Sequence, residues 1–476
     1  MTAPRPLHTI AGPKGLPLIG NAHQIRNEQF HAQLESWARE WGPVYSFAIG
    51  ARKFLCITQS DAIESVLRRR PAVFRRSSRL DQIASDTRFV GVFSANGDTW
   101  RRQRPMVTAG LDPTHVRAFM PVLSEVTGAL RQRWETAAQD GQEIDLLADL
   151  MRFTVDVTTS LAFGQNLHTL EETDDTHLIQ QHLNVIFPMM LRRLLAPVDV
   201  EHWMVRKETR LHLEALRKAV LGFIDRARAE LRADPELRSR PRNLLQAMLV
   251  ACESETGITE DDLVGNVFTI LLAGEDTTAS TVAWLLWLLH QHPDKLQQAR
   301  AEALAVLGED PQASRWEQLQ AMEFIQACAQ ETLRLKPVAP LIINEANEDA
   351  VVADVLVPKG SFVMCVMRPA GLDAREIVDA ASFSPGRWVD QGAMAAAARH
   401  ATMPFGSGPR ICPGRYLALA EIKAVASMIL TRFDLDDLAT NSPTEKFTFV
   451  MAPVGLRSRP RVRQSAAASR QPQALA

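Results

Sequence analysis

Apolar residues recur at spacings of three and four over most of the chain from about residue 61 to 335, with Ala, Leu, Glu and Arg between them. This period is that of an amphipathic helix, and the intervening residues are strong helix formers. The pattern changes to alternation over residues 44–58, around Gly50, and over residues 350–362, around a Pro-Lys-Gly turn. Alternation predicts β-hairpins at both places and a third between residues 447 and 462. We therefore expect a mainly α-helical fold with small β-sheets.

The longest helical pattern runs from residue 259 to 292 and is followed by Pro293. Thr259 and Asp262 have the spacing of a capping pair at its start. Two apolar runs are separated by acidic residues and threonines around Asp276. An acidic side chain at the centre of a bilayer costs about 2.5 to 3.5 kcal/mol, so the pattern favours one continuous helix buried in a large protein over a membrane span. Its polar middle is a candidate site, because buried polar groups need partners.

The composition is that of a globular protein, with 476 residues, 46% hydrophobic and 23% charged. No repeat or Gly/Ser-rich or Pro-rich linker divides the chain, so we expect one large domain over residues 1–463 and a disordered tail at 464–476. The formal charge of −2 provides no basic field to attract nucleic acid. The first residues have no apolar run of signal-peptide or anchor length. We expect a soluble, cytoplasmic monomer without a membrane anchor.

One of the five cysteines stands in an unusual context. Their odd number and the lack of a CxxC pair argue against a disulfide framework and a zinc site. Cys412 lies in the Gly-rich segment 405–414, directly before a helical pattern that begins at Arg415. Free N–H groups at a helix start favour a thiolate, and the glycines allow a flat group to approach closely. The other four, Cys56, Cys252, Cys328 and Cys365, are expected to be structural.

The segment 405–414 resembles F-x-x-G-x-R-x-C-x-G, the haem-binding signature of the cytochrome P450 family. The match covers all fixed positions, which are Phe405, Gly408, Arg410, Cys412 and Gly414. The resemblance implies the cytochrome P450 fold, with a long central oxygen-binding helix, and Cys412 as the ligand of the iron of haem b. It extends over nearly the whole chain and is strongest to the branch with fatty-acid hydroxylases and microsomal enzymes, of which this would be a soluble, bacterial-type member.

The polar middle of the long helix, residues 273–278, resembles the oxygen-binding groove of the same family. This resemblance implies that Ala273 leaves room above the iron and that Asp276 and Thr277 are catalytic, managing the protons used with O2. Taken alone, an acid beside a threonine is more often a buried hydrogen-bonded pair. The signature around Cys412 reverses that preference.

Two further motifs resemble family features that support the haem. Glu331 and Arg334 lie on one helical face, and the resemblance implies that they form a buried triad with Arg387 beneath the haem rather than a surface salt bridge. Trp100 and Arg104 are also one turn apart, and the resemblance implies that they bind the haem propionates together with Arg410.

Two departures from the family pattern stand out. Asn344 occupies a position where a basic residue often contacts a propionate, and it cannot supply a charge. Residues 371–374, Gly-Leu-Asp-Ala, replace the usual H-R-D-P turn. We therefore expect no charged contact with a propionate from Asn344.

The resemblance implies a monooxygenase that inserts one atom of O2 into an apolar small molecule. Electrons from NAD(P)H would arrive through a separate ferredoxin or flavodoxin with its reductase, because the chain after Gly414 is too short for a flavin or iron–sulfur domain and has no four-cysteine pattern. Arg101, Arg102 and Arg415 are candidates for a basic docking patch, although exposed arginines are as often solvated surface charges.

Several alternatives stay open at this point. A peroxygenase or a haem-thiolate isomerase or dehydratase would use the same cysteine, and a non-enzymatic haem sensor is a further reading. A cysteine hydrolase would need a histidine near Cys412, for which His400 is the neighbour in sequence. Four apolar segments are candidates for the substrate cavity or for ordinary core: Phe89, Val90, Val92 and Phe93, then residues 186–191, 338–342 and 451–454.

Overall fold

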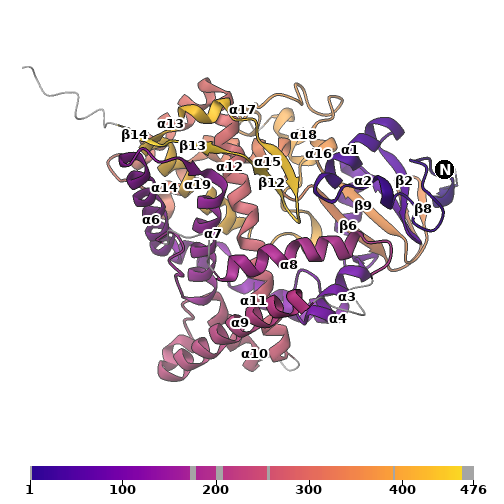
Figure 1. The fold of residues 1–476 in the computed structure, drawn as a ribbon, viewed down its shortest axis with the longest axis horizontal. Coiled ribbons are helices and arrows are strands. Elements are labelled where there is room, and N and C mark those ends of the chain that lie inside the picture. The colour runs from indigo at the N-terminus through magenta and orange to yellow at the C-terminus, as the bar shows by residue number, and fades with distance from the viewer. Residues whose placement is uncertain (1–2, 172–177, 200–206, 255–257, 390–391, 464–476) are drawn as a thin grey trace, which may run out of the picture.

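The computed structural model describes residues 3–171, 178–199, 207–254, 258–389 and 392–463. Most of the chain forms a helical body, and a sheet-rich part that contains the N-terminal residues lies at one side (Figure 1). The mainly helical fold with small sheets is confirmed. The predicted tail at 464–476 lies outside the described residues.

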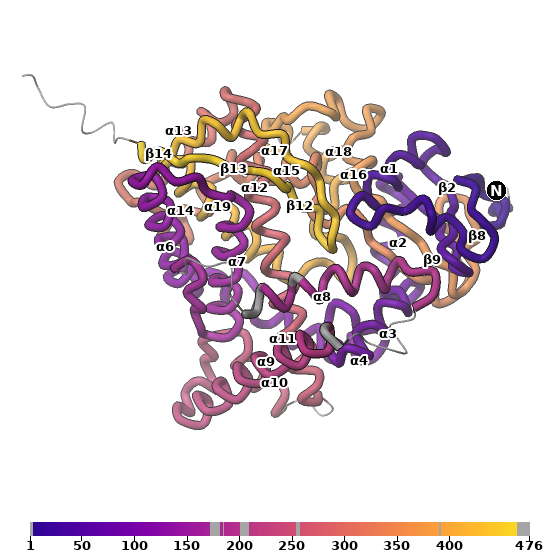
Figure 2. Tube along the Cα trace, in the orientation of Figure 1, coloured from indigo at the N-terminus to yellow at the C-terminus, as the bar shows by residue number. Residues whose placement is uncertain are grey.

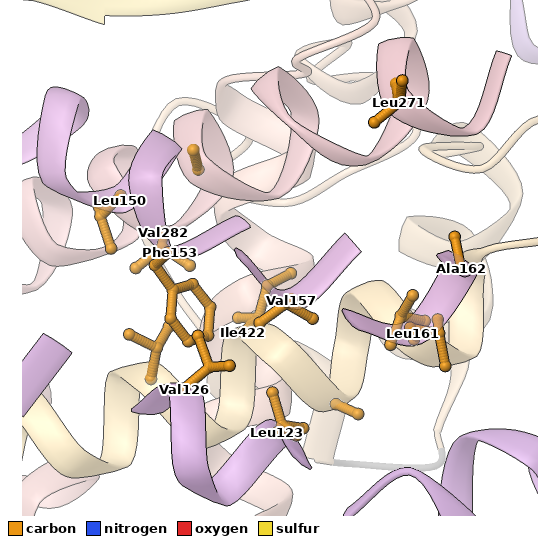
Figure 3. Packing of buried hydrophobic residues seen from close by; sticks show 14 of the residues in the cluster. Leu123, Val126, Leu150, Phe153, Val157, Leu161, Ala162, Leu271, Val282 and Ile422 are labelled. Atoms are coloured by element: carbon orange, nitrogen blue, oxygen red, sulfur yellow. The ribbon is translucent and has the colours of Figure 1, made fainter. Parts of the chain in front are cut away.

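The centre of the helical body is α7 (Leu146–Phe163), a helix buried along most of its length. It starts at Asp145, whose side chain accepts the N–H of Ala148, and ends at Gly164 with φ of 68°. Figure 3 shows its side chains among those of α6 (Met120–Gln139), α12 (Asp276–Gln291) and α19 (Arg415–Arg432). Each large apolar side chain buried there contributes about 1.5 to 3 kcal/mol.

The other helices are distributed over the helical body and the sheet-rich part, as the tube in Figure 2 shows. Those in the first half are α1 (Phe30–Trp41), α2 (Ser60–Arg68), α3 (Ser78–Thr87), α4 (Gly97–Ala109), α5 (Pro113–Ala118), α8 (Leu178–Leu195), α9 (Lys207–Ala233) and α10 (Leu244–Ser254). Those in the second half are α13 (Pro293–Leu307), α14 (Trp316–Ala321), α15 (Glu323–Leu335), α16 (Arg368–Gly371), α17 (Gly386–Val389) and α18 (Ala393–Ala401). Within the part of the chain that the structure describes, none of these helices is long and apolar enough to cross a membrane.

The largest sheet has five strands in the order β2-β3-β9-β6-β4. The predicted first hairpin is confirmed, because β2 (Val44–Ile49) and β3 (Arg52–Ile57) pair antiparallel around Gly50, which has φ of 59°. β9 (Phe362–Val366) lies parallel to β3 and antiparallel to β6 (Leu341–Ala346). The edge strand β4 (Phe74–Arg76) pairs with β6 so that Arg76 stands opposite Asn344.

The second and third hairpins differ in detail from the prediction. In the second, β7 (Ala350–Val352) and β8 (Val355–Val357) turn at Ala353 and Asp354, whose φ angles of 45° and 66° give the twist that two-residue hairpins need. The predicted Pro-Lys-Gly turn instead leads from β8 to β9. The third hairpin joins β11 (Thr444–Phe447) to β12 (Met451–Val454).

Short strands from distant segments explain why the third hairpin ends early. After β12 the chain forms β13 (Arg457–Ser458), which pairs with β5 (Ile144–Asp145). It then forms β14 (Arg461–Val462), which pairs with β10 (Phe433–Asp434). Pairing with partners far away in the sequence overrides the local alternation.

The long central helix is not continuous. The capping box of Thr259 and Asp262 is confirmed at the start of α11 (Glu260–Gly274), but α11 ends at Gly274 and α12 begins only at Asp276. Glu275 separates them, with φ of −73° and ψ of −71°. The Thr277 hydroxyl donates to the carbonyl of Ala273 at 2.8 Å. A helix bends where glycine weakens it and a side-chain hydroxyl takes up a backbone carbonyl.

Candidate functional site

The loop that carries Cys412 is fixed by backbone contacts. The Cys412 N–H donates to the carbonyl of Phe405 at 2.8 Å, and α19 begins three residues later at Arg415. Gly408 has φ of 72°, and a Cβ there would lie 2.7 Å from the Cα of Arg68. Only glycine therefore allows the loop to press against α2.

Burial acts against a free thiolate at Cys412. It raises the pKa of the thiol, while the Gly414 N–H and the charges of Arg104 and Arg415 lower it in part. The prediction that the helix start by itself favours the thiolate is thus too simple, because burial outweighs the local N–H groups. A bound metal ion would change the balance, since coordination deprotonates a thiol.

The other cysteines have no comparable surroundings. None of the five forms a disulfide, and Cys56, Cys328 and Cys365 are buried, with pKa values that burial raises. Cys252 is half-buried, with its sulfur 3.7 Å from that of Met106. The described residues include no group of three or more His, Cys, Asp or Glu side chains placed to hold a metal ion.

The predicted propionate ligands do lie together beside the Cys412 loop. Arg104 donates to the carbonyl of Ile411 at 2.6 Å. The Arg410 guanidinium stacks 4.7 Å from the Trp100 ring centre and donates to the carbonyl of Ala95 at 2.6 Å. Its Nε is buried without a hydrogen-bond partner.

Sequence reasoning missed two further arginines at this place. Arg76 lies 4.5 Å from the ring centre of Phe93, and its buried Nε has no hydrogen-bond partner. Arg70 donates to the carbonyl of Ser407 at 3.2 Å. The two consecutive arginines after Phe74 are a sequence signal that could have pointed to a basic site here.

We refer to Arg70, Arg76 and Arg410 as the arginine cluster. Burial lowers the pKa of each, to about 10 for Arg70 and about 9 for Arg410, and mutual repulsion adds to this effect for Arg76 and Arg410. Arg70 and Arg410 are buried, and Arg76 is half-buried with a buried Nε. Among the described residues no carboxylate lies within 4 Å of any of them, whereas buried cations are normally paired. The cluster therefore suits an anion that comes from outside the chain.

The break between α11 and α12 presents the two predicted catalytic side chains. Asp276 and Thr277 are half-buried, and Ala273 is exposed, although most of their neighbours on both helices are buried. Burial raises the pKa of Asp276 to about 6. The carboxyl can therefore hold or release a proton near neutral pH.

The predicted triad is confirmed as a buried ion cluster. Arg334 donates to both oxygens of Glu331 at 2.8 and 2.7 Å, and Arg387 donates to one of them at 3.1 Å. Trp388 adds a hydrogen bond of 2.8 Å. Although burial opposes the charged form, the hydrogen bonds and charge of Arg334 keep the pKa of Glu331 below its usual value. The surface salt-bridge alternative is wrong, because all the side-chain pairs are buried.

The two departures from the family pattern now have a structural context. Asn344 is fully buried, and its amide group lies near the carbonyl of Ile342 and the sulfur of Cys365. The cation on the opposite strand is Arg76. In the replaced turn, the carbonyl of Gly371 accepts a hydrogen bond of 2.6 Å from Arg334, so this segment helps to hold the triad.

Two of the predicted apolar segments meet at Phe449 through aromatic contacts, and the other two share a backbone hydrogen bond. Phe93 lies edge-on to Phe449 at 5.7 Å between ring centres, and Phe187 of α8 stacks on Phe449 at 6.0 Å. The Met451 N–H donates to the carbonyl of Val338 at 2.9 Å. Phe449 was not among the predicted residues, since its place in the turn before β12 gave no periodic signal.

The remaining candidates lie elsewhere. His400 is half-exposed, and its Nε2 lies 2.9 Å from Asp61 and its Nδ1 3.8 Å from Glu64, so both nitrogens face carboxylates of α2. This arrangement gives no support to a cysteine hydrolase. Arg101 is exposed and pairs with Asp98, and Arg102 is half-buried.

Fold and site together define a class: a large helical protein with a single candidate thiolate ligand, a broken helix carrying an acid and a threonine, and buried cations that suit an anionic cofactor. Comparison with known proteins agrees, because the model of the family described as Cytochrome P450 matches residues 10–458. The chain belongs to the cytochrome P450 family and is an oxidoreductase, a haem-dependent monooxygenase.

Its curated relatives include proteins of plants and of a nematode. The chain is 27% identical to Cytochrome P450 714C3 of Oryza sativa subsp. japonica over 451 residues, covering 89% of this chain and 86% of the relative. It is 28% identical to Cytochrome P450 734A6 of the same plant, covering 90% and 81%. It is 25% identical to the putative cytochrome P450 CYP13A3 of Caenorhabditis elegans, covering 90% and 88%.

Proposed function

We propose that Cys412 would ligate the iron of haem b and that the arginine cluster would hold the haem carboxylates. The observation that carries this proposal is the presence of buried, unpaired guanidinium atoms of Arg76 and Arg410 beside the Cys412 loop. Trp100 and Arg104 would complete the set, and Arg76 would supply the charge that Asn344 lacks. Bound haem supplies the reduction of O2 and the transfer of one oxygen atom to the substrate.

The test is the spectrum of the reduced protein with carbon monoxide. Thiolate ligation gives a strongly red-shifted Soret band, and Cys412→His should abolish it. Cys252→His is the matched control, because Cys252 is also only partly buried. A red-shifted band that survives in the Cys412 variant would overturn the assignment.

Asp276 and Thr277 are proposed to deliver protons on the substrate side. The pKa of about 6 suits Asp276 to exchange protons with solvent near neutral pH. The Thr277 hydroxyl, which donates to the carbonyl of Ala273, could instead donate a hydrogen bond on the substrate side when haem is bound. Thr277→Ala should bind haem normally but release more peroxide per NAD(P)H consumed, while Thr277→Ser restores coupling. An unchanged peroxide ratio in Thr277→Ala would contradict this role.

The proposed substrate is an apolar small molecule. Support comes from the contacts among Phe93, Phe187 and Phe449, which bring an apolar loop, α8 and the β11–β12 turn together. Spectral titration with lipids, terpenoids and polyketides would identify the class. Phe449→Ala should weaken binding of the best ligand, and tight binding of polar ligands only would refute the proposal.

Electrons are proposed to come from NAD(P)H through a ferredoxin or flavodoxin. Arg415, which donates to the carbonyl of Cys412 at 3.3 Å, and the half-buried Arg102 are candidate docking cations. Arg101 is less available, because it pairs with Asp98. In stopped-flow measurements, salt and Arg102→Glu should slow reduction by the partner. Rapid reduction by NADPH alone would contradict a separate partner, and turnover with peroxide alone would favour a peroxygenase.

A monomeric enzyme over residues 1–463 is part of the same proposal. Light scattering during size-exclusion chromatography tests it, and a stable dimer would refute it. Removal of residues 464–476 should leave haem content unchanged.

A further inference from the structure

The helix α7 contacts the break between α11 and α12 through two threonines one turn apart. The hydroxyl oxygen of Thr154 lies 2.8 Å from the carbonyl of Glu275, the residue between the two helices, and 3.0 Å from the carbonyl of Met151 in its own helix. A Cβ added to Gly274 would lie 2.3 Å from the hydroxyl oxygen of Thr158. Both threonines are almost fully buried.

The closeness of the two helices depends on Gly274. Glycine in a helix interior is less favourable than alanine by about 1 kcal/mol. Here the missing side chain leaves the space that Thr158 occupies, so α7 can approach the end of α11. Only at this separation does the hydroxyl of Thr154 reach the carbonyl of Glu275.

The hydrogen bond from Thr154 bears on the peptide that precedes Asp276. A carbonyl oxygen accepts two hydrogen bonds, so the hydroxyl adds a directional contact to the carbonyl of Glu275. Asp276 and Thr277 follow this peptide directly. If the break moved by one residue, these side chains would turn by about 100° around the helix axis, given 3.6 residues per turn.

We propose that Thr154 is a positioning residue, which fixes the break at Glu275 and thereby the directions of Asp276 and Thr277. The proposal rests on the proposed function of that pair. Thr154 would act only through the backbone of Glu275, from a helix that carries none of the other candidate residues. Its hydroxyl is the part that matters, since valine would fill the same space.

The test compares three variants of the haem-loaded protein. Thr154→Val removes the hydroxyl, and Thr154→Ser keeps it. Thr159→Val is the matched control, because the buried Thr159 hydroxyl lies 2.9 Å from the carbonyl of Val155 in its own helix. The readouts are hydrogen–deuterium exchange of the amides of residues 275–279, peroxide released per NAD(P)H consumed, and thermal unfolding.

In Thr154→Val we expect roughly two- to tenfold faster exchange at residues 275–279, the factor that one net hydrogen bond provides, and more peroxide. Thr154→Ser should restore both values, and Thr159→Val should change neither even if its unfolding temperature falls equally. Unchanged exchange in Thr154→Val would overturn the proposal, and so would equal changes in Thr159→Val. If Thr277→Ala itself releases no extra peroxide, the role of the pair fails, whereas exchange, which needs no turnover, still decides the role of Thr154.

Discussion

Two groups of buried or half-buried arginines in this protein have opposite surroundings. Arg334 and Arg387 share the carboxylate of Glu331, which receives hydrogen bonds from both guanidinium groups. The arginine cluster, Arg70, Arg76 and Arg410, has no carboxylate partner among the described residues: it contacts backbone carbonyls, aromatic rings and the side-chain amide of Asn96. Burial costs the same kind of desolvation in both places, but only the first group is neutralised by the chain itself.

The difference separates a structural site from a binding site. An arginine cannot lose its proton to escape the cost of burial, so an unpaired cluster requires an external anion. A buried carboxyl, in contrast, can become neutral by binding a proton. Glu421 on α19 contacts Thr278 of α12, and burial raises the pKa of Glu421 to about 8, so that it is mostly protonated at neutral pH. An anionic cofactor with two carboxylates, such as haem, can supply the negative charge that this cluster lacks.

The largest effect is expected at the triad. Glu331→Ala leaves Arg334 and Arg387 buried without a carboxylate, which typically costs about 3 to 5 kcal/mol. Arg334→Ala and Arg387→Ala each remove one of the two cations that pair with the buried carboxylate of Glu331. We expect little haem-loaded protein from all three variants, measured by absorbance and denaturant unfolding. Normal haem incorporation in all three variants would show that the triad of Glu331, Arg334 and Arg387 does not stabilise the fold.

The second prediction concerns the neutral carboxyl of Glu421. A folded-state pKa of about 8, above the usual 4.5, means that the protonated group stabilises the fold at low pH. That stability is lost as pH rises from about 5 to 8, by up to about 1.4 kcal/mol per pH unit. Glu421→Gln should remove this dependence and be the more stable protein at pH 8. Identical pH profiles of unfolding would contradict the neutral state.

Mutation in the arginine cluster should weaken haem binding without lowering the stability of the haem-free protein. Arg76→Met removes a half-buried cation that has no carboxylate partner among the described residues, so the haem-free protein should be no less stable. Haem should dissociate roughly ten- to a hundredfold faster, as expected for the loss of a charged hydrogen bond. Haem transfer to apomyoglobin measures this rate, and Arg68→Met, which removes an exposed arginine paired with Glu64, is the control. If Arg76→Met destabilised the haem-free protein as much as Glu331→Ala does, the arginine cluster would be structural like the triad, and the prediction would be wrong.

The smallest effect should come from giving the cluster an internal anion. The amide oxygen of Asn96 lies 3.3 Å from Arg410, so Asn96→Asp would place a carboxylate there. We expect haem affinity to fall by a few fold, because Arg410 would then be paired within the chain. Asn96→Ser removes the amide without adding charge and serves as the control. Tighter haem binding in Asn96→Asp would contradict the assignment of an anionic ligand.

The sequence by itself determined the features that depend on residues close together in the chain. The Gly-rich segment placed Cys412 before a helix, the capping residue Thr259 set the start of α11, and the spacing of Glu331 and Arg334 put them on one face. Each of these depends on residues within one or two turns, so the chain order is enough. Alternation likewise indicated the hairpins, although the turn of the second one was set by the left-handed Ala353 and Asp354.

Tertiary structure decided everything that depends on contacts between distant segments. Arg387, the third member of the triad, reaches Glu331 only because the fold brings the two segments together. The break at Glu275 likewise depends on how closely α7 approaches Gly274. Arg76 became a candidate only through its place opposite Asn344 and its burial without an anion. Charge pairing and desolvation are properties of three-dimensional surroundings, which residue order does not contain.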